Sequence, residues 1–183
     1  CANLIILSKN RKKIKRKKKE KKFDSVLANK ILKDLPFKLT RSQMNVLNEI
    51  NSDLKSNTRM FRIIQGDVGS GKTIVSLIAM ANVIESKYQC AIMVPTEILA
   101  KQHYNLARKV FSKINIKINL LTGKTENKER KRIIHDLENG KIDLIVGTHA
   151  LFQKKIIFKK LGLSVIDEQH KFGDKQRSEL AKK

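Results

Sequence analysis

The sequence is poor in cysteine and in acidic residues, and it has no long hydrophobic run. Its only cysteines are Cys1 and Cys90, and Cys90 lies in an apolar stretch where a buried, reduced thiol is expected. The apolar residues 4–7 are far too few to cross a bilayer, and the basic run follows them, whereas in a signal peptide it would precede them. These absences exclude a disulfide framework and a membrane span, and they predict a cytoplasmic protein.

The scarcity of acidic residues leaves a large positive charge. The chain has 17 Asp and Glu residues against 40 Lys and Arg residues, which gives a net charge of +23. Such an excess indicates a polyanionic partner such as DNA or RNA. Lysine far outnumbers arginine, however, and Ile and Asn are abundant, as an AT-rich genome would also produce. The charge alone therefore leaves nucleic-acid binding and compositional drift both open.

Much of this charge is concentrated in the run KNRKKIKRKKKEKK, residues 9–22. Its charges would repel one another in a free helix. The run is explained either as a solvated linker or helix surface, or as an arm that contacts nucleic acid.

The rest of the chain predicts a single α/β domain. With 183 residues, one packed core plus an appendage is expected. A short helix ends before Pro36, and the capping-box pattern TRSQ at residues 40–43 begins another. Apolar strands then alternate with amphipathic helices, as in a doubly wound parallel sheet. We expect strands at residues 62–65, 90–94, 116–121, 143–146 and 163–167, and helices at residues 72–86, 97–112 and 128–139.

The stretch GDVGSGKT, residues 66–73, has the spacing of a phosphate-binding loop, and it lies between an expected strand and an expected helix. Glycines let backbone N–H groups curl around a phosphate where a Cβ would block the turn. We expect Lys72 to reach the β- and γ-phosphate oxygens and the hydroxyl of Thr73 to bind Mg²⁺.

A loop of this type needs a carboxylate at the end of another strand. In LSVIDEQH, Asp167 stands at the tip of a buried strand, where it would hold Mg²⁺, and Glu168 is placed to orient or deprotonate a water molecule. The pair predicts hydrolysis of a nucleotide. ATP is favoured over GTP because the nearest match to the guanine-reading pattern N-K-x-D, residues 127–130, lacks the aspartate. The four histidines are scattered without metal-ligand spacing.

Several further strings accompany these two motifs. They are LPFKLTRSQ at residues 35–43, MVPTEILAKQHY at 93–104, LLTGK at 120–124 and VGTHALFQ at 146–153. Together with GDVGSGKT and DEQH they resemble the motifs of superfamily 2 helicases and translocases, and within these the RecG family of bacterial DNA helicases. The resemblance implies a P-loop NTPase of RecA-like fold that uses ATP and Mg²⁺ and acts on branched DNA, such as stalled replication forks and Holliday junctions, in repair and recombination.

The resemblance also implies roles for individual residues. The catalytic set would be Lys72, Asp167, Glu168, Gln169 and His170. Asp167 and Thr73 would bind Mg²⁺. Gln43 would hydrogen-bond adenine with Phe37 nearby, although the capping box alone also explains Gln43. The nucleotide would further contact Gly66, Asp67, Val68, Gly69, Ser70, Gly71, Lys72 and Thr73. The DNA backbone would be contacted by Thr96, Thr122, Gly123, Thr148 and His149.

The same resemblance predicts the organisation of the chain. Residues 1–34 would form a basic helical linker, since ANLIILSKNRKK is similar to the helix that leads into the motor, and residues 35–183 would form the first RecA-like lobe. The second lobe and the DNA-wedge domain, which would be its partners, are expected to be absent. Two alternatives stay open: a transcription-repair coupling translocase, whose motor is similar, and a truncated remnant that binds nucleotide or DNA without catalysis.

Overall fold

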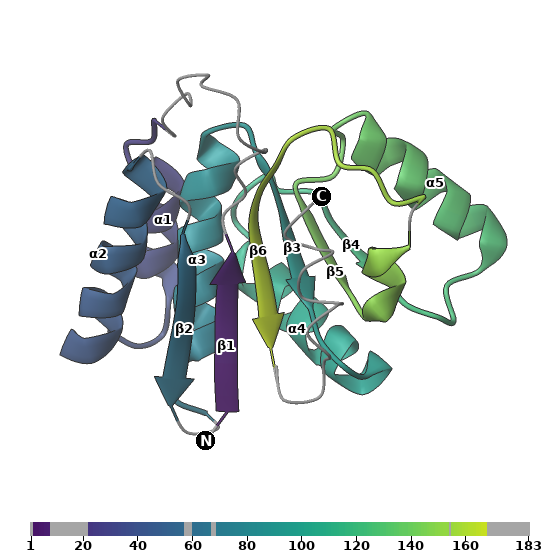
Figure 1. Ribbon diagram of the computed structural model, residues 1–183. Helices are drawn as coiled ribbons and strands as arrows, with labels where there is room; N and C mark the ends of the chain where they lie inside the picture. Colours follow the sequence, from purple (N-terminus) through teal and green to yellow (C-terminus); the bar gives the residue numbers. More distant parts are fainter. Residues whose placement is uncertain (1, 8–21, 57–59, 67–68, 154, 168–183) are drawn as a thin grey trace.

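The computed structural model describes residues 2–7, 22–56, 60–66, 69–153 and 155–167. Strands and helices alternate along most of this part (Figure 1). The strands are β1 (Ala2–Leu7), β2 (Phe61–Gly66), β3 (Gln89–Met93), β4 (Ile118–Leu121), β5 (Leu144–Gly147) and β6 (Leu161–Asp167). The helices are α1 (Val26–Asp34), α2 (Arg41–Lys55), α3 (Lys72–Glu85), α4 (Glu97–Val110), α5 (Asn127–Glu138) and the short 3₁₀ helix η1 (His149–Phe152).

The strands form one sheet in the order β2-β1-β6-β3-β5-β4. The pairs β3–β6, β3–β5 and β4–β5 are parallel. Strand β1 is antiparallel to both of its neighbours, so β2 and β6 run in the same direction, as their arrows in Figure 1 show. All strands from β2 onward therefore share one direction, which confirms the expected parallel α/β sheet.

Strand β1 differs from the expectation for the N-terminal region. Residues 1–34 were expected to form a basic helical linker, and the structure has a strand at Ala2–Leu7 and a helix only at Val26–Asp34. The backbone of β1 pairs with β2 from Ala2 to Leu7 and with β6 from Leu4 to Leu7, so both edges of this apolar segment find partners. Residues 8–21 lie outside the described part, and the domain boundary near residue 35 stays a prediction.

Helices cover both faces of the sheet. On one face α1, α2, α3 and α4 share a core with the β3 side chains Cys90 and Ile92. On the other face α5 and η1 pack against Ala91 and Met93 of the same strand. The alternation along β3 is the period of two that a strand buried on both sides requires. This is the doubly wound arrangement predicted from the sequence.

Helix α3 lies deepest, because every residue from Val75 to Ile84 is buried. Its one buried amide, Asn82, donates a 2.8 Å hydrogen bond to Asn51 of α2. Cys90 is a buried thiol, as expected. No helix in the described ranges is long and apolar enough to span a membrane.

Candidate functional site

The described parts of the phosphate loop, the segments predicted to contact DNA and Asp167 lie at one edge of the sheet. Strand β2 ends at Gly66, β3 at Met93, β4 at Leu121, β5 at Gly147 and β6 at Asp167. Since these strands share one direction, their carboxyl ends meet at the same edge, the lower one in Figure 1. Ligands of open α/β sheets bind at the carboxyl ends of the strands.

The phosphate loop joins β2 to α3. Gly69 and Gly71 both have positive φ, 83° and 76°, a backbone conformation that glycine adopts without strain. Gly71 is the N-cap of α3, so the first N–H groups of this helix have no partner within the helix and point toward the loop. Asp67 and Val68, which were also predicted to contact the nucleotide, lie outside the described residues.

Lys72 and Thr73 form the first turn of α3. The ammonium group of Lys72 donates a 3.0 Å hydrogen bond to the hydroxyl of Ser70, which brings the charge over the loop. Both residues are half-buried. The lysine therefore lies where a phosphate held by the loop would meet it.

Gln43 is bound to the phosphate loop as well as to its own helix. Its side-chain oxygen accepts a 2.9 Å hydrogen bond from the backbone N–H of Thr40, and its own N–H donates to the Thr40 hydroxyl at 3.2 Å. This confirms the capping box at the start of α2. The side-chain nitrogen of Gln43 also donates a 2.9 Å bond to the carbonyl of Ser70. No local sequence pattern predicts this second contact.

A pocket of about 470 Å³ lies between α2 and the loop, and the residues of α2, β2, the loop and α3 that line it include Gln43, Val46, Ile64, Ser70 and Lys72. Its position beside the phosphate loop suits a nucleotide. Phe37 is 49% exposed and is not among the lining residues, and the adenine roles of Phe37 and Gln43 stay predictions.

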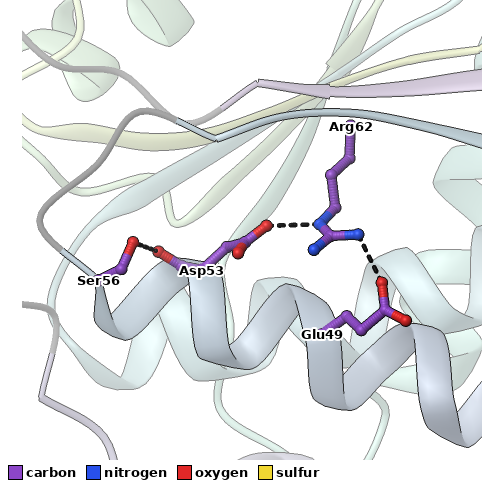
Figure 2. Close-up of polar contacts among 4 residues, drawn as sticks. All are labelled: Glu49, Asp53, Ser56 and Arg62. Carbon is purple, nitrogen blue, oxygen red and sulfur yellow. Dashed lines mark hydrogen bonds and ion pairs between the residues drawn. The ribbon is translucent and has the colours of Figure 1, made fainter.

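Helix α2 is held to β2 by a second set of contacts (Figure 2). The guanidinium of Arg62 reaches from the strand to the carboxylates of Asp53, at 2.5 Å, and Glu49, at 2.6 Å. The hydrogen bond with Asp53 raises the pKa of Arg62 above its ordinary value. The helix that carries Gln43 is thus fixed to the strand that leads into the phosphate loop.

Asp167 lies at the end of β6, on the other side of β1 from the loop. Strand β1 alone separates β2 from β6, so these two strands are about 10 Å apart, which is two strand spacings of about 4.8 Å. Its carboxylate is 2.7 Å from Nε2 of His103 on α4, and both side chains are largely buried. Glu168, Gln169 and His170 lie outside the described residues.

The contact with His103 was missed by sequence analysis. The two residues are 64 positions apart, and the histidines have no metal-ligand spacing. The only signal was the position of His103 on the buried face of α4, in line with Ala100 and Ala107.

The residues predicted to contact DNA lie at the ends of β3, β4 and β5. The hydroxyl of Thr96 caps α4 by accepting from the N–H of Leu99 at 3.3 Å. Glu97 then accepts a 3.2 Å bond from the N–H of Lys124 and pairs with its ammonium group at 3.3 Å. The N–H of Thr148 donates to the carbonyl of Leu121 at 3.3 Å. These bonds bring the three segments together.

Their side chains differ in exposure. Thr96, Gly123 and His149 are exposed, whereas Thr122 and Thr148 are buried. The hydroxyl of Thr122 accepts from the N–H of Lys124 at 3.3 Å, and the hydroxyl of Thr148 has no hydrogen-bond partner among the described residues. Thr122 therefore supports its turn. Any contact of this turn with DNA would come from backbone N–H groups or from neighbouring side chains.

Comparison with known families identifies this arrangement. Residues 40–183 match the DEAD/DEAH box helicase family, which covers the phosphate loop, the edge segments and Asp167. The chain belongs to this family. The motifs of this helicase family imply use of ATP, which the phosphate loop suits.

The chain is also similar to individual helicases. It is 50% identical over 163 residues to the ATP-dependent DNA helicase RecG of Thermotoga maritima, covering 89% of this chain and 21% of the relative. It is 49% identical over 154 residues to RecG of Bacillus subtilis, covering 84% of this chain and 23% of the relative. A solved structure of RecG bound to a three-way DNA junction matches with a TM-score of 0.74 and 48% identity, over 78% of this chain and 20% of that one. The resemblance to RecG is thereby confirmed, and the chain spans about a fifth of the length of these relatives.

Proposed function

We propose that this chain is the first motor lobe of a RecG-type helicase that couples ATP hydrolysis to movement on branched DNA in the longer protein. One observation carries the proposal: in a chain about half identical to RecG, the phosphate loop and Asp167 lie at the carboxyl edge of one sheet. The solved relative is bound to a three-way DNA junction, which supports branched DNA as the partner.

The residues present fit ATP and Mg²⁺. Gly69 and Gly71 have the positive φ that a phosphate cradle needs, and a Cβ on Gly71 would lie 2.4 Å from the side-chain nitrogen of Gln43. The hydroxyl of Thr73 and the carboxylate of Asp167 would supply oxygen ligands, which Mg²⁺ prefers. When bound, Mg²⁺ would neutralise charge on the phosphate oxygens.

The residues of this chain would then have separate roles in binding and hydrolysis. The N–H groups at the start of α3 and the ammonium group of Lys72 would bind phosphate oxygens and stabilise their charge. Glu168 would accept a proton from the attacking water, and Gln169 and His170 would respond to the γ-phosphate. The exposed edge near Thr96, Gly123 and His149 would contact the DNA backbone without specificity for base sequence.

The test is an ATPase assay of the full-length protein with and without forked DNA. We expect DNA-stimulated turnover in the wild type, and at least a hundredfold lower turnover in Lys72→Ala and Glu168→Gln, because each removes a group that acts on the transition state. Lys30→Ala is the matched control, since this lysine is exposed on α1 and lies near Gln89 and Lys160, at the opposite end of the sheet.

Unchanged turnover in Lys72→Ala or Glu168→Gln would contradict the assignment of the site. ATPase activity that does not respond to forked DNA would agree with the assignment of the nucleotide site. It would contradict the proposed coupling of ATP hydrolysis to movement on DNA.

A further inference from the structure

The contact between His103 and Asp167 joins two elements that the motifs treat separately. Asp167 ends β6, and His103 lies in the second turn of α4, whose first residue follows Thr96. Nε2 of His103 is 2.7 Å from Oδ2 of Asp167, and their side chains are only 11% and 14% exposed. A short bond in such a sheltered place orients both groups, because little water competes for it.

The direction of this bond follows from its chemistry. An ionised carboxylate can only accept hydrogen bonds, so Nε2 of His103 must carry a hydrogen and donate it. The bond restricts rotation of the Asp167 carboxylate about its Cβ–Cγ axis.

Helix α4 is itself firmly seated. Ala100 and Ala107 are fully buried on the same face as His103, so the helix packs closely on the sheet. At its first turn Glu97 is bound to Lys124 through both backbone and side chain. A histidine on so fixed a support can set the position of its partner, which is what an outer-shell residue of a metal site does.

We propose that His103 is a positioning residue that holds the carboxylate of Asp167 in the orientation that binds Mg²⁺ beside the phosphate loop. The inference rests on the proposed role of Asp167 as a metal ligand. It assigns to α4, which begins at the DNA-facing edge, a direct contact with the metal site.

The experiment measures metal affinity and not turnover. Mn²⁺ binding to the full-length protein is followed by electron paramagnetic resonance in the presence of ADP, since Mn²⁺ accepts the same oxygen ligands as Mg²⁺. His103→Leu keeps an apolar body of similar size and removes the donor. We expect it to weaken Mn²⁺ binding about tenfold, as loss of an outer-shell partner does.

Two conservative variants separate positioning from packing. In His103→Gln the amide nitrogen can reach the place of Nε2, so wild-type affinity is expected to be retained. In His103→Asn the amide is too short to reach Asp167, so the affinity should fall as in His103→Leu. Comparison of these two variants also tests whether His103 positions Asp167 if His103→Leu does not fold. The matched control is His135→Leu, because His135 on α5 also lies beside an aspartate, Asp136 at 3.5 Å, but is 67% exposed.

Asp167→Asn distinguishes failure of this inference from failure of the proposed function. If Asp167→Asn weakens Mn²⁺ binding while the His103 variants all bind like the wild type, His103 is not a positioning residue and Asp167 remains a ligand. If Asp167→Asn also leaves the affinity unchanged, the proposed metal role of Asp167 is wrong, and the role of His103 falls with it.

Discussion

The phosphate loop contains two glycines at which a side chain would have different consequences. Both have positive φ, 83° at Gly69 and 76° at Gly71. A Cβ on Gly71 would lie 2.4 Å from the side-chain nitrogen of Gln43, whereas a Cβ on Gly69 would meet no atom within 4 Å. The two positions share the strain of a left-handed backbone and differ only in the space around them.

We expect Gly69→Ala to lower the free energy of unfolding by roughly 1–2 kcal/mol, the cost of a left-handed conformation for an L residue. Gly71→Ala should lower it further, because the side chain of Gln43 must also leave the carbonyl of Ser70. Urea denaturation of both variants measures the difference, and in a Gln43→Ala background the difference should disappear. Equal losses in the original background would mean that Gln43 moves aside at no cost.

Single residues also show how far the sequence could predict the site. The glycine spacing was enough to predict a phosphate loop, because the spacing itself encodes the backbone conformation. The capping box of Thr40 and Gln43 was predicted because it is local. The bonds from Gln43 to Ser70 and from His103 to Asp167 join residues far apart in the chain, and only the packing of α2 and α4 brings them together.

At the scale of elements, α2 is joined to the phosphate-binding segment at two points. Near its start Gln43 contacts Ser70, and further along Glu49 and Asp53 bind Arg62 of β2. Arg62 and its partners are about one-third to three-fifths exposed, so water screens much of their attraction. The fork geometry of the guanidinium nevertheless lets one residue fix two turns of the helix.

We expect Arg62→Met to lower the free energy of unfolding by roughly 0.5–1 kcal/mol, the range of well-formed pairs near the surface. The matched control is Lys113→Met, which removes a single pair with Asp34 whose lysine is 72% exposed, and its effect should be close to zero. Thermal unfolding at low and high salt measures both, and the Arg62 effect should shrink with salt. An Arg62→Met variant as stable as the wild type would show that packing alone holds α2 against β2.

The elements themselves were largely predictable, and the exceptions have physical causes. Continuous apolar runs predicted the buried parallel strands, since helices on both faces leave no polar side, and α3, α4 and α5 begin within one residue of the expected positions. Strand β1 was missed because its partners β2 and β6 lie far along the chain, and the resemblance of residues 2–13 to a helix that leads into the motor favoured a helical linker. The short helix η1 was missed because four residues carry no periodic pattern.

At the scale of the whole molecule, one edge of the sheet contains both proposed activities. The phosphate loop and Asp167 lie at the ends of β2 and β6, and the segments predicted to contact DNA lie at the ends of β3, β5 and β4. Helix α4 spans the two groups, with Thr96 at its start and His103 two turns further along. The segments predicted to contact DNA and the proposed metal site therefore lie on neighbouring parts of one sheet, as the proposed coupling between them requires.

The net charge of +23 leads to a last prediction, which concerns how much of it contacts DNA. Because DNA binding releases counterions, the logarithm of DNA affinity falls linearly with the logarithm of salt concentration. The slope is about 0.9 per phosphate contacted, so charges that stay in solvent do not change it. We expect replacement of the basic residues 15–19 by glutamine to leave this slope unchanged, as for a solvated run. Lys124→Gln, at an 85% exposed lysine of the turn predicted to contact DNA, should reduce the slope by about one contact. Fluorescence anisotropy with forked DNA across a salt series measures both, and a slope reduced by several contacts in the first variant would identify the run as a DNA-binding arm.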